Sequence, residues 1–280
     1  MIISVASGKG GTGKTTVAVN LALAMGKVQL LDCDVEEPNS AIFLKPEIES
    51  TESVSLPVPV IDRNKCVYCG KCAEVCAYGA LSIFKAGAGE VLFLPHLCHN
   101  CGACSFICPE KAVSEKDYEI GKIESGSSGQ IEYYCGRLNI GEIKSPSLIK
   151  ILKRKIKPEL NAVLDCPPGT SCPMMAAVKE SDFCILVTEP TPFGLHDLTL
   201  AAETVRKLGI RFGVFLNRAG GSDIIENYCC AEGIELLGRI PFDRELASLY
   251  SRGGTFSDIR PEYKRLFEDL AKDILGRGRK

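Results

Sequence analysis

The sequence of 280 residues predicts an α/β fold: a doubly wound, mostly parallel sheet that is interrupted by a small α+β insert. The chain opens with a strand, a glycine-rich turn, a helix and a second strand, and the same alternation resumes after residue 145. Between these parts, four cysteines recur with a shift of 32 residues. The same rhythm on both sides favours an insertion into one domain over a fusion of two domains.

Each element of the α/β part follows from its local pattern. Ser145 and Pro146 form a favourable helix start, with Ser as the N-cap and Pro at the first helical position. Apolar runs predict strands at 2–7, 27–32, 161–165, 183–188, 211–217 and 234–240. The expected helices are at 14–25, closed by Gly26, and at about 195–208, 222–232, 243–251 and 261–275.

The pattern is weak on both sides of the cysteines. Residues 45–60 hold three prolines and show no helical period, and residues 117–144 are rich in Gly and Ser, with only short strand-like pieces such as 130–134. We therefore expect the first part of the α/β domain at 1–58, the insert at 59–116 and the second part of the domain at 117–280.

Bulk composition excludes several classes of partner. Hydrophobic residues make up 45% of the chain, charged residues 24%, and the formal net charge is −2. No overall basicity points to nucleic acid or to an anionic membrane surface. No apolar stretch is long enough for a spanning helix. The mixed charge on the polar face of the last expected helix favours packing on the sheet over membrane binding.

The fifteen cysteines are too many for an ordinary cytosolic enzyme. A secretory leader would favour disulfides, but the apolar run 2–6 leads directly into Gly8 and leaves no room for one. We therefore expect a cytoplasmic, reducing compartment, in which cysteines act as metal ligands more often than as disulfides.

Residues 8–15, GKGGTGKT, match the phosphate-binding pattern G-x-x-x-x-G-K-[ST] at every fixed position. Glycines allow the backbone N–H groups to face a phosphate, and the following helix adds its dipole. Lys14 is expected to reach the β- and γ-phosphates of ATP, and the Thr15 hydroxyl to bind Mg²⁺. The predicted nucleotide contacts in this loop are Gly8, Lys9, Gly10, Gly11, Thr12, Gly13, Lys14, Thr15 and Thr16.

The stretch KGGTGKTT resembles the deviant Walker A motif of the MinD/ParA/Mrp-type P-loop ATPases, which include the nitrogenase iron protein. The resemblance implies that Lys9 reaches across an ATP-dependent homodimer to the phosphates of the partner. It also implies that Asp34 is the switch I residue that positions water, and that Asp165, in DCPPG, lies near Mg²⁺. With Lys14, these are the expected catalytic residues of a Mg-dependent ATPase.

Two later stretches resemble the part of this family that holds the base. In FLNR, Asn217 matches the residue that reads adenine, and in IPFD, Pro241 lies in the piece near the base and ribose. A strand-terminal Asn is also a common turn former, so this alternative remains open for Asn217.

The spacing C-x₂-C-x₂-C-x₃-C occurs twice and is that of bacterial ferredoxins, in which the fourth Cys of each run binds the other cluster. We therefore expect two [4Fe–4S] clusters. Zinc is the alternative, although zinc sites usually show two separated C-x₂-C pairs. Pro109 follows one fourth Cys but Ala77 follows the other, a departure that we expect to be tolerated. The expected ligand sets are Cys66, Cys69, Cys72 and Cys108, and Cys98, Cys101, Cys104 and Cys76.

Three further cysteines lie within or beside the nucleotide motifs: Cys33, Cys166 and Cys172. They either hold a subunit-bridging or transient cluster or are small buried residues. The absence of a C-x-x-C pair there favours the second interpretation.

The chain thus resembles a MinD-superfamily P-loop NTPase with an inserted small α+β ferredoxin domain. Three functions are open: ATP-gated electron transfer, iron–sulfur or metal-cofactor assembly, and spatial organisation with structural clusters. Eight permanent ligands favour the first. The resemblance also implies a protein partner of the nitrogenase-accessory or orange-protein type.

Overall fold

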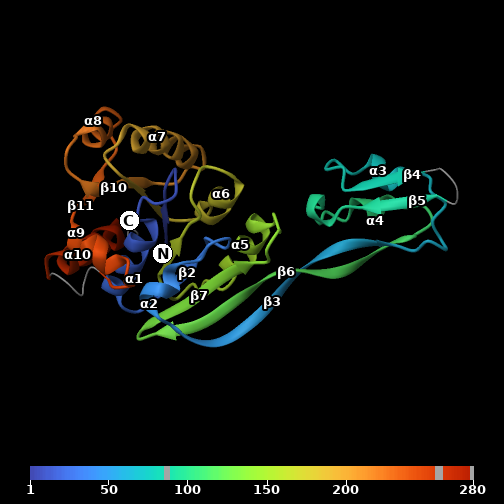
Figure 1. Cartoon of the computed structure of the whole chain (residues 1–280), viewed down its shortest axis with the longest axis horizontal. Coiled ribbons are helices and arrows are strands. Elements are labelled where there is room, and N and C mark those ends of the chain that lie inside the picture. Colours follow the sequence, from blue (N-terminus) through green and yellow to red (C-terminus); the bar gives the residue numbers. More distant parts are fainter. Residues whose placement is uncertain (85–88, 256–260, 278–280) are drawn as a thin grey trace. The chain divides into compact units, whose positions relative to one another are not determined.

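The computed structural model describes residues 1–84, 89–255 and 261–277 (Figure 1). Contacts divide the chain into two units. The first unit comprises Met1–Glu52, Lys122–Leu138 and Ser145–Lys280, and the second comprises Ser53–Gly121 and Asn139–Lys144.

The first unit is built on a sheet with the strand order β11-β10-β9-β1-β8-β2-β7-β6-β3. All neighbours from β11 to β7 are parallel. Because only two residues join β6 to β7, these two strands are antiparallel. The strands are β1 (Ile2–Ala6), β2 (Val28–Asp32), β3 (Glu47–Ile61), β6 (Val113–Ser128), β7 (Ile131–Leu138), β8 (Ala162–Asp165), β9 (Phe183–Thr188), β10 (Phe212–Ala219) and β11 (Leu236–Pro241).

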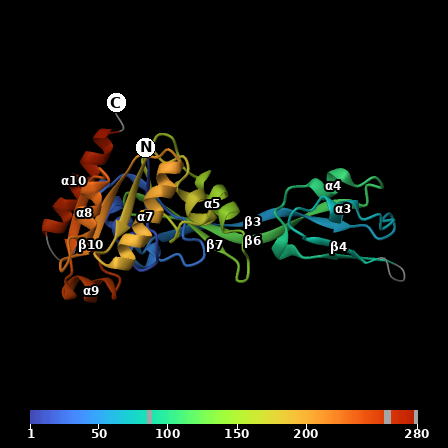
Figure 2. The same cartoon turned by 90° about the horizontal axis from the view of Figure 1, so that it is seen from above.

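Helices cover both faces of this sheet (Figures 1 and 2). The connection through α1 runs along the sheet in the opposite direction to those through α5, α6, α7 and α8, so right-handed crossovers place α1 on the opposite face. Helix α10 packs against α1. The helices are α1 (Lys14–Met25), α2 (Ser40–Leu44), α5 (Ser145–Lys153), α6 (Cys172–Val178), α7 (Pro192–Lys207), α8 (Ile224–Ala231), α9 (Arg244–Tyr250) and α10 (Pro261–Arg277).

The core lies around the central strands and α1. Strands β2, β8 and β9 are buried along their whole length, as expected for strands that are covered on both faces. Helix α1 is apolar nearly all round because one side contacts the sheet and another contacts α10. This packing fixes the loop between β1 and α1.

Backbone features of the second unit recur with a shift of 32 residues. Its elements are α3 (Lys71–Glu74), β4 (Leu81–Phe84), β5 (Glu90–Phe93), the 3₁₀ turn η1 (Pro95–Leu97) and α4 (Ala103–Ile107), with β4 and β5 antiparallel. Asp62 N donates to Ala112 O at 2.7 Å, and Leu94 N, 32 residues later, donates to Ala80 O at 2.9 Å. Left-handed backbone recurs at the same shift, in the pairs Tyr68 and Asn100, Gly70 and Gly102, and Gly79 and Lys111.

The two weakly patterned stretches form longer strands than we expected. Residues 45–60 lie largely within the 15-residue strand β3, and the Gly/Ser-rich stretch is taken up mainly by β6 and β7. Strand β3 stands at the end of the strand order, where proline leaves fewer unmet hydrogen bonds than in a central strand. Its residues 47–53 are exposed and include Glu47, Glu49 and Glu52.

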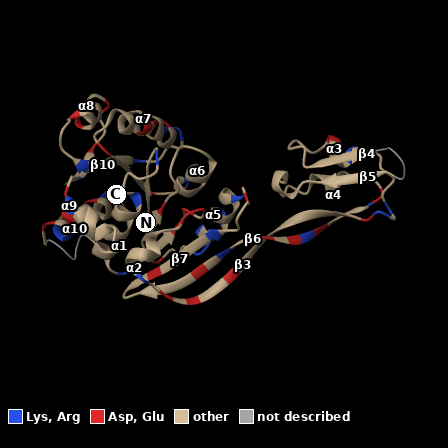
Figure 3. Cartoon of the chain, viewed as in Figure 1, with Lys and Arg blue, Asp and Glu red and all other residues tan. Residues whose placement is uncertain are grey.

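Charged residues are interspersed along the elements of both units (Figure 3). This distribution accords with the near balance of 33 basic and 35 acidic side chains. Within the described residues, no helix combines the length and apolarity needed to cross a membrane.

Candidate nucleotide and thiol sites

The loop between β1 and α1 needs glycine at both ends. Gly13 has a φ of 93°, and a Cβ atom there would lie 2.3 Å from Asn217 Nδ2. A Cβ atom on Gly8 would lie 2.1 Å from the carbonyl oxygen of Asp197, in α7. In contrast, apart from its two chain neighbours, no atom of the described residues lies within 4 Å of a Cβ built on Gly10. The loop is therefore packed closely against α7 and β10 at its ends and is open in its middle.

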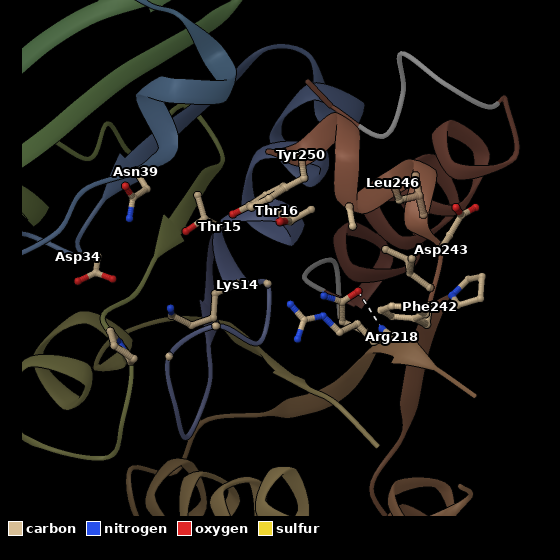
Figure 4. Close-up of a pocket in the computed structure, with 18 of the residues that line it drawn as sticks. Lys14, Thr15, Thr16, Asp34, Asn39, Arg218, Phe242, Asp243, Leu246 and Tyr250 are labelled. Carbon is tan, nitrogen blue, oxygen red and sulfur yellow. Dashed lines mark hydrogen bonds between the residues drawn. The ribbon is translucent and has the colours of Figure 1, made fainter. Parts of the chain in front are cut away.

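A cavity of about 450 Å³ opens beside this loop. Figure 4 shows Lys14, Thr15 and Asp34 toward one end of it and Arg218, Phe242 and Asp243 toward the other. The lining residues are Gly10, Gly11, Gly13, Lys14, Thr15, Thr16, Asp34, Glu37, Asn39, Pro168, Asn217, Arg218, Ile240, Pro241, Phe242, Asp243, Leu246, Ala247 and Tyr250.

Most of the nucleotide contacts expected from the sequence line this cavity, including Asn217 and Pro241. Gly8, Lys9 and Thr12 lie outside its lining. Asn217 Nδ2 donates to Thr12 O at 2.9 Å, so this side chain braces the phosphate loop from β10. Its Oδ1 accepts from Arg218 N at 2.9 Å. Asn217 thus combines a bracing role with a place in the cavity wall.

The carboxylate of Asp165 is fully buried at the end of β8, beside the Thr15 hydroxyl. Burial and the neighbouring Asp32 raise its pKa to about 8, and the nearby Lys14 opposes this rise. A buried carboxylate beside a phosphate loop and the Thr15 hydroxyl has the chemistry of a Mg²⁺ site.

Asp34 lies in the cavity wall opposite the loop. Burial raises its pKa to about 6, against the attraction of the Lys14 ammonium. Lys14 is itself only 6% exposed. A carboxylate with this pKa exchanges a proton near neutral pH, which suits a residue that orients water.

Asp32 is a structural carboxylate that sequence reasoning left without a role. It accepts hydrogen bonds from Ser40 N at 3.0 Å, from Ser40 Oγ at 2.5 Å and from Asp34 N at 3.2 Å. The Ser40 hydroxyl also lies 3.2 Å from the Tyr133 hydroxyl. This buried network fixes the segment that carries Asp34. The bonds from Ser40, in α2, form only through the fold, so no local pattern marks Asp32 as their acceptor.

The segment after β8 is bonded to the strand that precedes the phosphate loop. Cys166 N donates to Val5 O at 3.0 Å, and Gly169 N donates to Ser7 O at 3.0 Å. Gly169 has a φ of 90°. The Cys33 and Cys166 thiols are fully buried, and burial raises the pKa of both. These two are protonated core side chains, while Cys172 is exposed at the start of α6.

The Lys9 side chain forms an ion pair within its own chain. Its ammonium lies 2.5 Å from Glu189 Oε1, and Arg218 Nη1 lies 3.0 Å from Glu189 Oε2. Glu189 follows β9 directly and was not predicted as a site residue.

Helix α9 supplies a wall of the cavity that the sequence did not reveal. Leu246, Ala247 and Tyr250 line the cavity, and the Tyr250 ring stacks on Phe43 with centroids 4.5 Å apart. The nearby IPFD stretch was the only local signal, because α9 reaches the cavity through the fold and not through a motif.

The eight cysteines of the second unit gather into two sets, and each set combines three residues of one run with the fourth of the other. These sets line two separate small cavities: Cys66, Cys69, Cys72 and Cys108 line one, and Cys76, Cys98, Cys101 and Cys104 line the other.

The two fourth cysteines have matching surroundings. Ala80 N lies 3.3 Å from Cys76 Sγ, and Ala112 N lies 3.3 Å from Cys108 Sγ. The turn at Cys76 therefore keeps its geometry although Ala77 stands where Pro109 stands in the other copy. In the described ranges no three Cys, His, Asp or Glu side chains converge closely enough for a single ion. Four thiols around one cavity are a donor set that either an iron–sulfur cluster or zinc accepts.

The family follows from a comparison of the sequence with known families. The model of the CobQ/CobB/MinD/ParA nucleotide binding domain matches residues 3–256. The chain belongs to this family. The match spans both units, and it includes the phosphate loop and all the residues that line the cavity described above.

Three known proteins are similar to most of this chain or to a short part of it. An uncharacterized protein of Methanocaldococcus jannaschii is 32% identical over 282 residues, which cover 98% of each chain. An iron–sulfur cluster carrier protein of Pyrococcus abyssi is 26% identical over 274 residues, 86% of this chain and 74% of the relative. An uncharacterized ferredoxin of M. jannaschii is 38% identical over 55 residues, 19% of this chain and 71% of the relative.

Solved structures of the family share the fold. The septum site-determining protein MinD of Pyrococcus horikoshii, in complex with Mg-ADP, superposes with a TM-score of 0.61 at 22% identity. The alignment covers 98% of this chain and 95% of that one. The chain therefore has a MinD-like P-loop NTPase fold with a large, mostly parallel sheet.

Proposed function

We propose that this protein is a Mg-dependent ATPase that forms a homodimer around ATP and uses its nucleotide state to control electron transfer from two [4Fe–4S] clusters to a protein partner. The observation that carries the coupling is the 139–144 segment, whose residues pack within the second unit while both neighbours of the segment belong to the first.

Both ends of the 139–144 segment are tied beside Asp34. Leu138 N donates to Val35 O at 2.8 Å, and the Ser145 hydroxyl donates to the Glu36 carboxylate. Val35 and Glu36 directly follow the residue that we assign to the attacking water. A change at Asp34 on ATP binding would therefore act on both ends of this segment.

The body of the same segment is fixed within the second unit. Lys144 Nζ donates to Pro95 O at 3.0 Å and to Glu142 at 2.9 Å, and the Tyr118 hydroxyl donates to Glu142 at 2.6 Å. Lys144 is only 6% exposed. Pro95 opens the short turn that leads to Cys98, a predicted cluster ligand. The segment thus offers a route from the nucleotide site to a thiol set, which runs along the backbone to Lys144 and then through its hydrogen bond to Pro95.

In the nucleotide site, Lys14 would stabilise the transferred phosphoryl group, and Asp34 would orient the attacking water. Asp165 and Thr15 would hold Mg²⁺, which supplies charge neutralisation at the phosphates. The buried Asp165 carboxylate, beside the Thr15 hydroxyl, supports this assignment. We propose that Lys9 acts on the phosphates of the partner subunit, and that Asn217 and Pro241 lie at the base.

In the second unit, we propose that each thiol set holds one [4Fe–4S] cluster, which supplies one-electron chemistry. The set of four thiols around each cavity supports this assignment, as does the similarity to a ferredoxin. The protein contributes N–H donors to the fourth sulfur of each set, and such bonds stabilise a thiolate ligand. Eight reduced thiols also favour the cytoplasm as the location.

The test uses the whole protein with its clusters. The clusters are reduced anaerobically, an electron acceptor is added, and reoxidation is followed by absorbance with and without Mg-ATP, while iron content is tracked. We expect ATP to change the reoxidation rate at constant iron content, and Lys14→Ala to abolish the ATP effect. Equal rates with and without ATP, in a protein that hydrolyses ATP, would overturn the electron-transfer proposal.

A second function is iron–sulfur cluster transfer. It is favoured by the similarity to an iron–sulfur cluster carrier protein across 86% of the chain. In the same experiment this function predicts loss of iron to an acceptor apoprotein when ATP is present. The partner would then be a small cofactor-binding protein, of the nitrogenase-accessory or orange-protein type, and not a redox protein.

A further inference from the structure

A single carboxylate, that of Glu189, binds two cations beside the phosphate loop. Its two oxygens are divided between them, with Lys9 Nζ at 2.5 Å from Oε1 and Arg218 Nη1 at 3.0 Å from Oε2. The Glu189 side chain is 14% exposed and that of Lys9 is 28% exposed. Burial alone would raise the pKa of Glu189. The hydrogen bond from Lys9 nevertheless holds this pKa below its ordinary value. The carboxylate is therefore charged and doubly paired.

The backbone that carries Glu189 is held rigidly at the start of α7. Thr191 N donates to Glu189 O at 2.8 Å, and Gly194 N donates to Thr191 Oγ1 at 2.9 Å. A Cβ atom on Gly194 would lie 2.2 Å from Glu189 O, so the turn is tightly closed. The backbone position of Glu189 is thus set by the fold and not by Lys9.

The backbone of Lys9 is also constrained, so a change of partner would involve only its side chain. The Ser7 hydroxyl donates to Lys9 O at 2.6 Å, and Gly8 packs on the backbone of Asp197. Lys9 does not line the nucleotide cavity of its own chain. Its ammonium is therefore held away from its own phosphate site.

We propose that Glu189 is a positioning residue that stores Lys9 in the separate subunit and releases it when two subunits close on ATP. This inference rests on the proposed homodimer. Arg218 makes the exchange feasible, because it remains on the second oxygen of Glu189 and keeps the carboxylate paired after Lys9 leaves. Loss of one partner from a half-buried pair is otherwise costly.

The first arm of the test needs only the nucleotide-free protein. Acetylation of Lys9 by a limiting amine reagent is quantified by mass spectrometry in the wild type and in Glu189→Gln. An ion-paired lysine is a poor nucleophile, so we expect roughly twofold to fivefold faster acetylation of Lys9 in the variant. The control is Glu232→Gln, which removes a pair of similar geometry, 2.9 Å to Arg206, away from the cavity.

The second arm measures dimer formation by analytical ultracentrifugation with Mg²⁺ and a non-hydrolysable ATP analogue. Because the variant no longer holds Lys9, we expect Glu189→Gln to dimerise with a roughly fivefold lower dissociation constant. Glu189→Asp, which keeps the charge but shortens its reach, should lie between the wild type and Glu189→Gln. Thermal unfolding of each variant verifies that it is folded.

The outcomes separate this inference from the function on which it rests. Unchanged acetylation of Lys9 in Glu189→Gln, or an equal or weaker dimer in that variant, would overturn the storage role while leaving the proposed function intact. Failure of the wild type to dimerise with the analogue would overturn the proposed homodimer, and the release step with it.

Discussion

At the scale of single residues, the two ends of the phosphate loop depend on the absence of a side chain, and this dependence can be measured without any nucleotide. Gly13→Ala places a methyl group 2.3 Å from Asn217 Nδ2 at a φ of 93°. We expect it to lower the free energy of unfolding by roughly 1–3 kcal/mol, since both strain and the lost Asn217–Thr12 bond act together.

The matched control for this variant is Gly10→Ala, because no atom of the described residues, apart from its two chain neighbours, lies within 4 Å of its Cβ position. Its free energy of unfolding in urea should stay within about 0.5 kcal/mol of the wild type. Equal destabilisation by the two substitutions would show that contact with Asn217 is not what requires glycine at residue 13.

The buried carboxylate of Asp165 is expected to lower the free energy of unfolding of the metal-free protein. A carboxyl whose pKa is raised on folding, here from 3.8 to about 8, binds more protons in the folded state. Its contribution therefore lowers the free energy of unfolding progressively as the pH rises from about 4 to about 8. Asp165→Asn removes this penalty, and we expect it to raise stability by roughly 1–3 kcal/mol at pH 8 while abolishing ATP hydrolysis.

Urea unfolding of the nucleotide-free and Mg-free protein at several pH values checks this expectation. The gain from Asp165→Asn should grow between pH 5 and pH 8, whereas the exposed Asp269→Asn should show no such trend, its side chain being 78% exposed. A gain that is independent of pH would mean that Asp165 is already ionised in the folded protein.

At the scale of elements, the 139–144 segment should transmit the nucleotide state. The double variant Lys144→Met and Glu142→Gln removes the bonds to Pro95 and within the segment, without leaving a buried charge unpaired. We expect it to keep its ATP turnover and its iron content, but to reduce the ATP effect on cluster reoxidation at least severalfold.

The control for this element is Lys122→Met. It removes an ion pair with Glu124 at 3.1 Å, but Arg137 still binds the same carboxylate at 2.8 Å. Stopped-flow reoxidation of both proteins decides the matter, and an ATP effect of wild-type size in the double variant would exclude this segment as the route.

The sequence predicted some elements more closely than others, for physical reasons. Helix α1 has the predicted bounds, 14–25, because a phosphate loop and Gly26 delimit it. Strands β3 and β6, of 15 and 16 residues, were missed as continuous elements. Residues 47–53 of β3 are exposed, and β6 mixes exposed with buried residues, so neither strand has a clear local period. Their regularity comes from pairing with each other across the chain, which a local pattern does not contain.

At the scale of the whole molecule, iron content distinguishes two ways in which the eight cysteines could bind two clusters: in the crossed sets described above, or with each C-x₂-C-x₂-C-x₃-C run holding its own cluster. Cys72→Ala with Cys108→Ala removes two ligands of one set, so about four of eight iron atoms should remain. Cys72→Ala with Cys76→Ala removes one ligand from each set and should deplete both clusters. Iron analysis and the spectra of the reduced proteins measure the difference. The reverse result would mean that each run holds its own cluster.

The candidate sites show the same division between local and distant information. Lys14, Thr15 and Asn217 were found from motifs, since their spacing along the chain reflects the ligand. Glu189 and Tyr250 were not, because their roles arise where β9 and α9 meet the loop in space. The crossing of the cysteines was expected from the family resemblance, whereas their spacing alone leaves the pairing open.

The acidic edge of the sheet bears on how copies of this protein approach one another. Strand β3 ends the strand order and exposes Glu47 and Glu49, which lie on a row of backbone groups open to pairing. A second copy adding its own β3 there would bring like charges together, a common protection against open-ended strand addition and aggregation. Addition of a second copy at this edge of the sheet is therefore disfavoured.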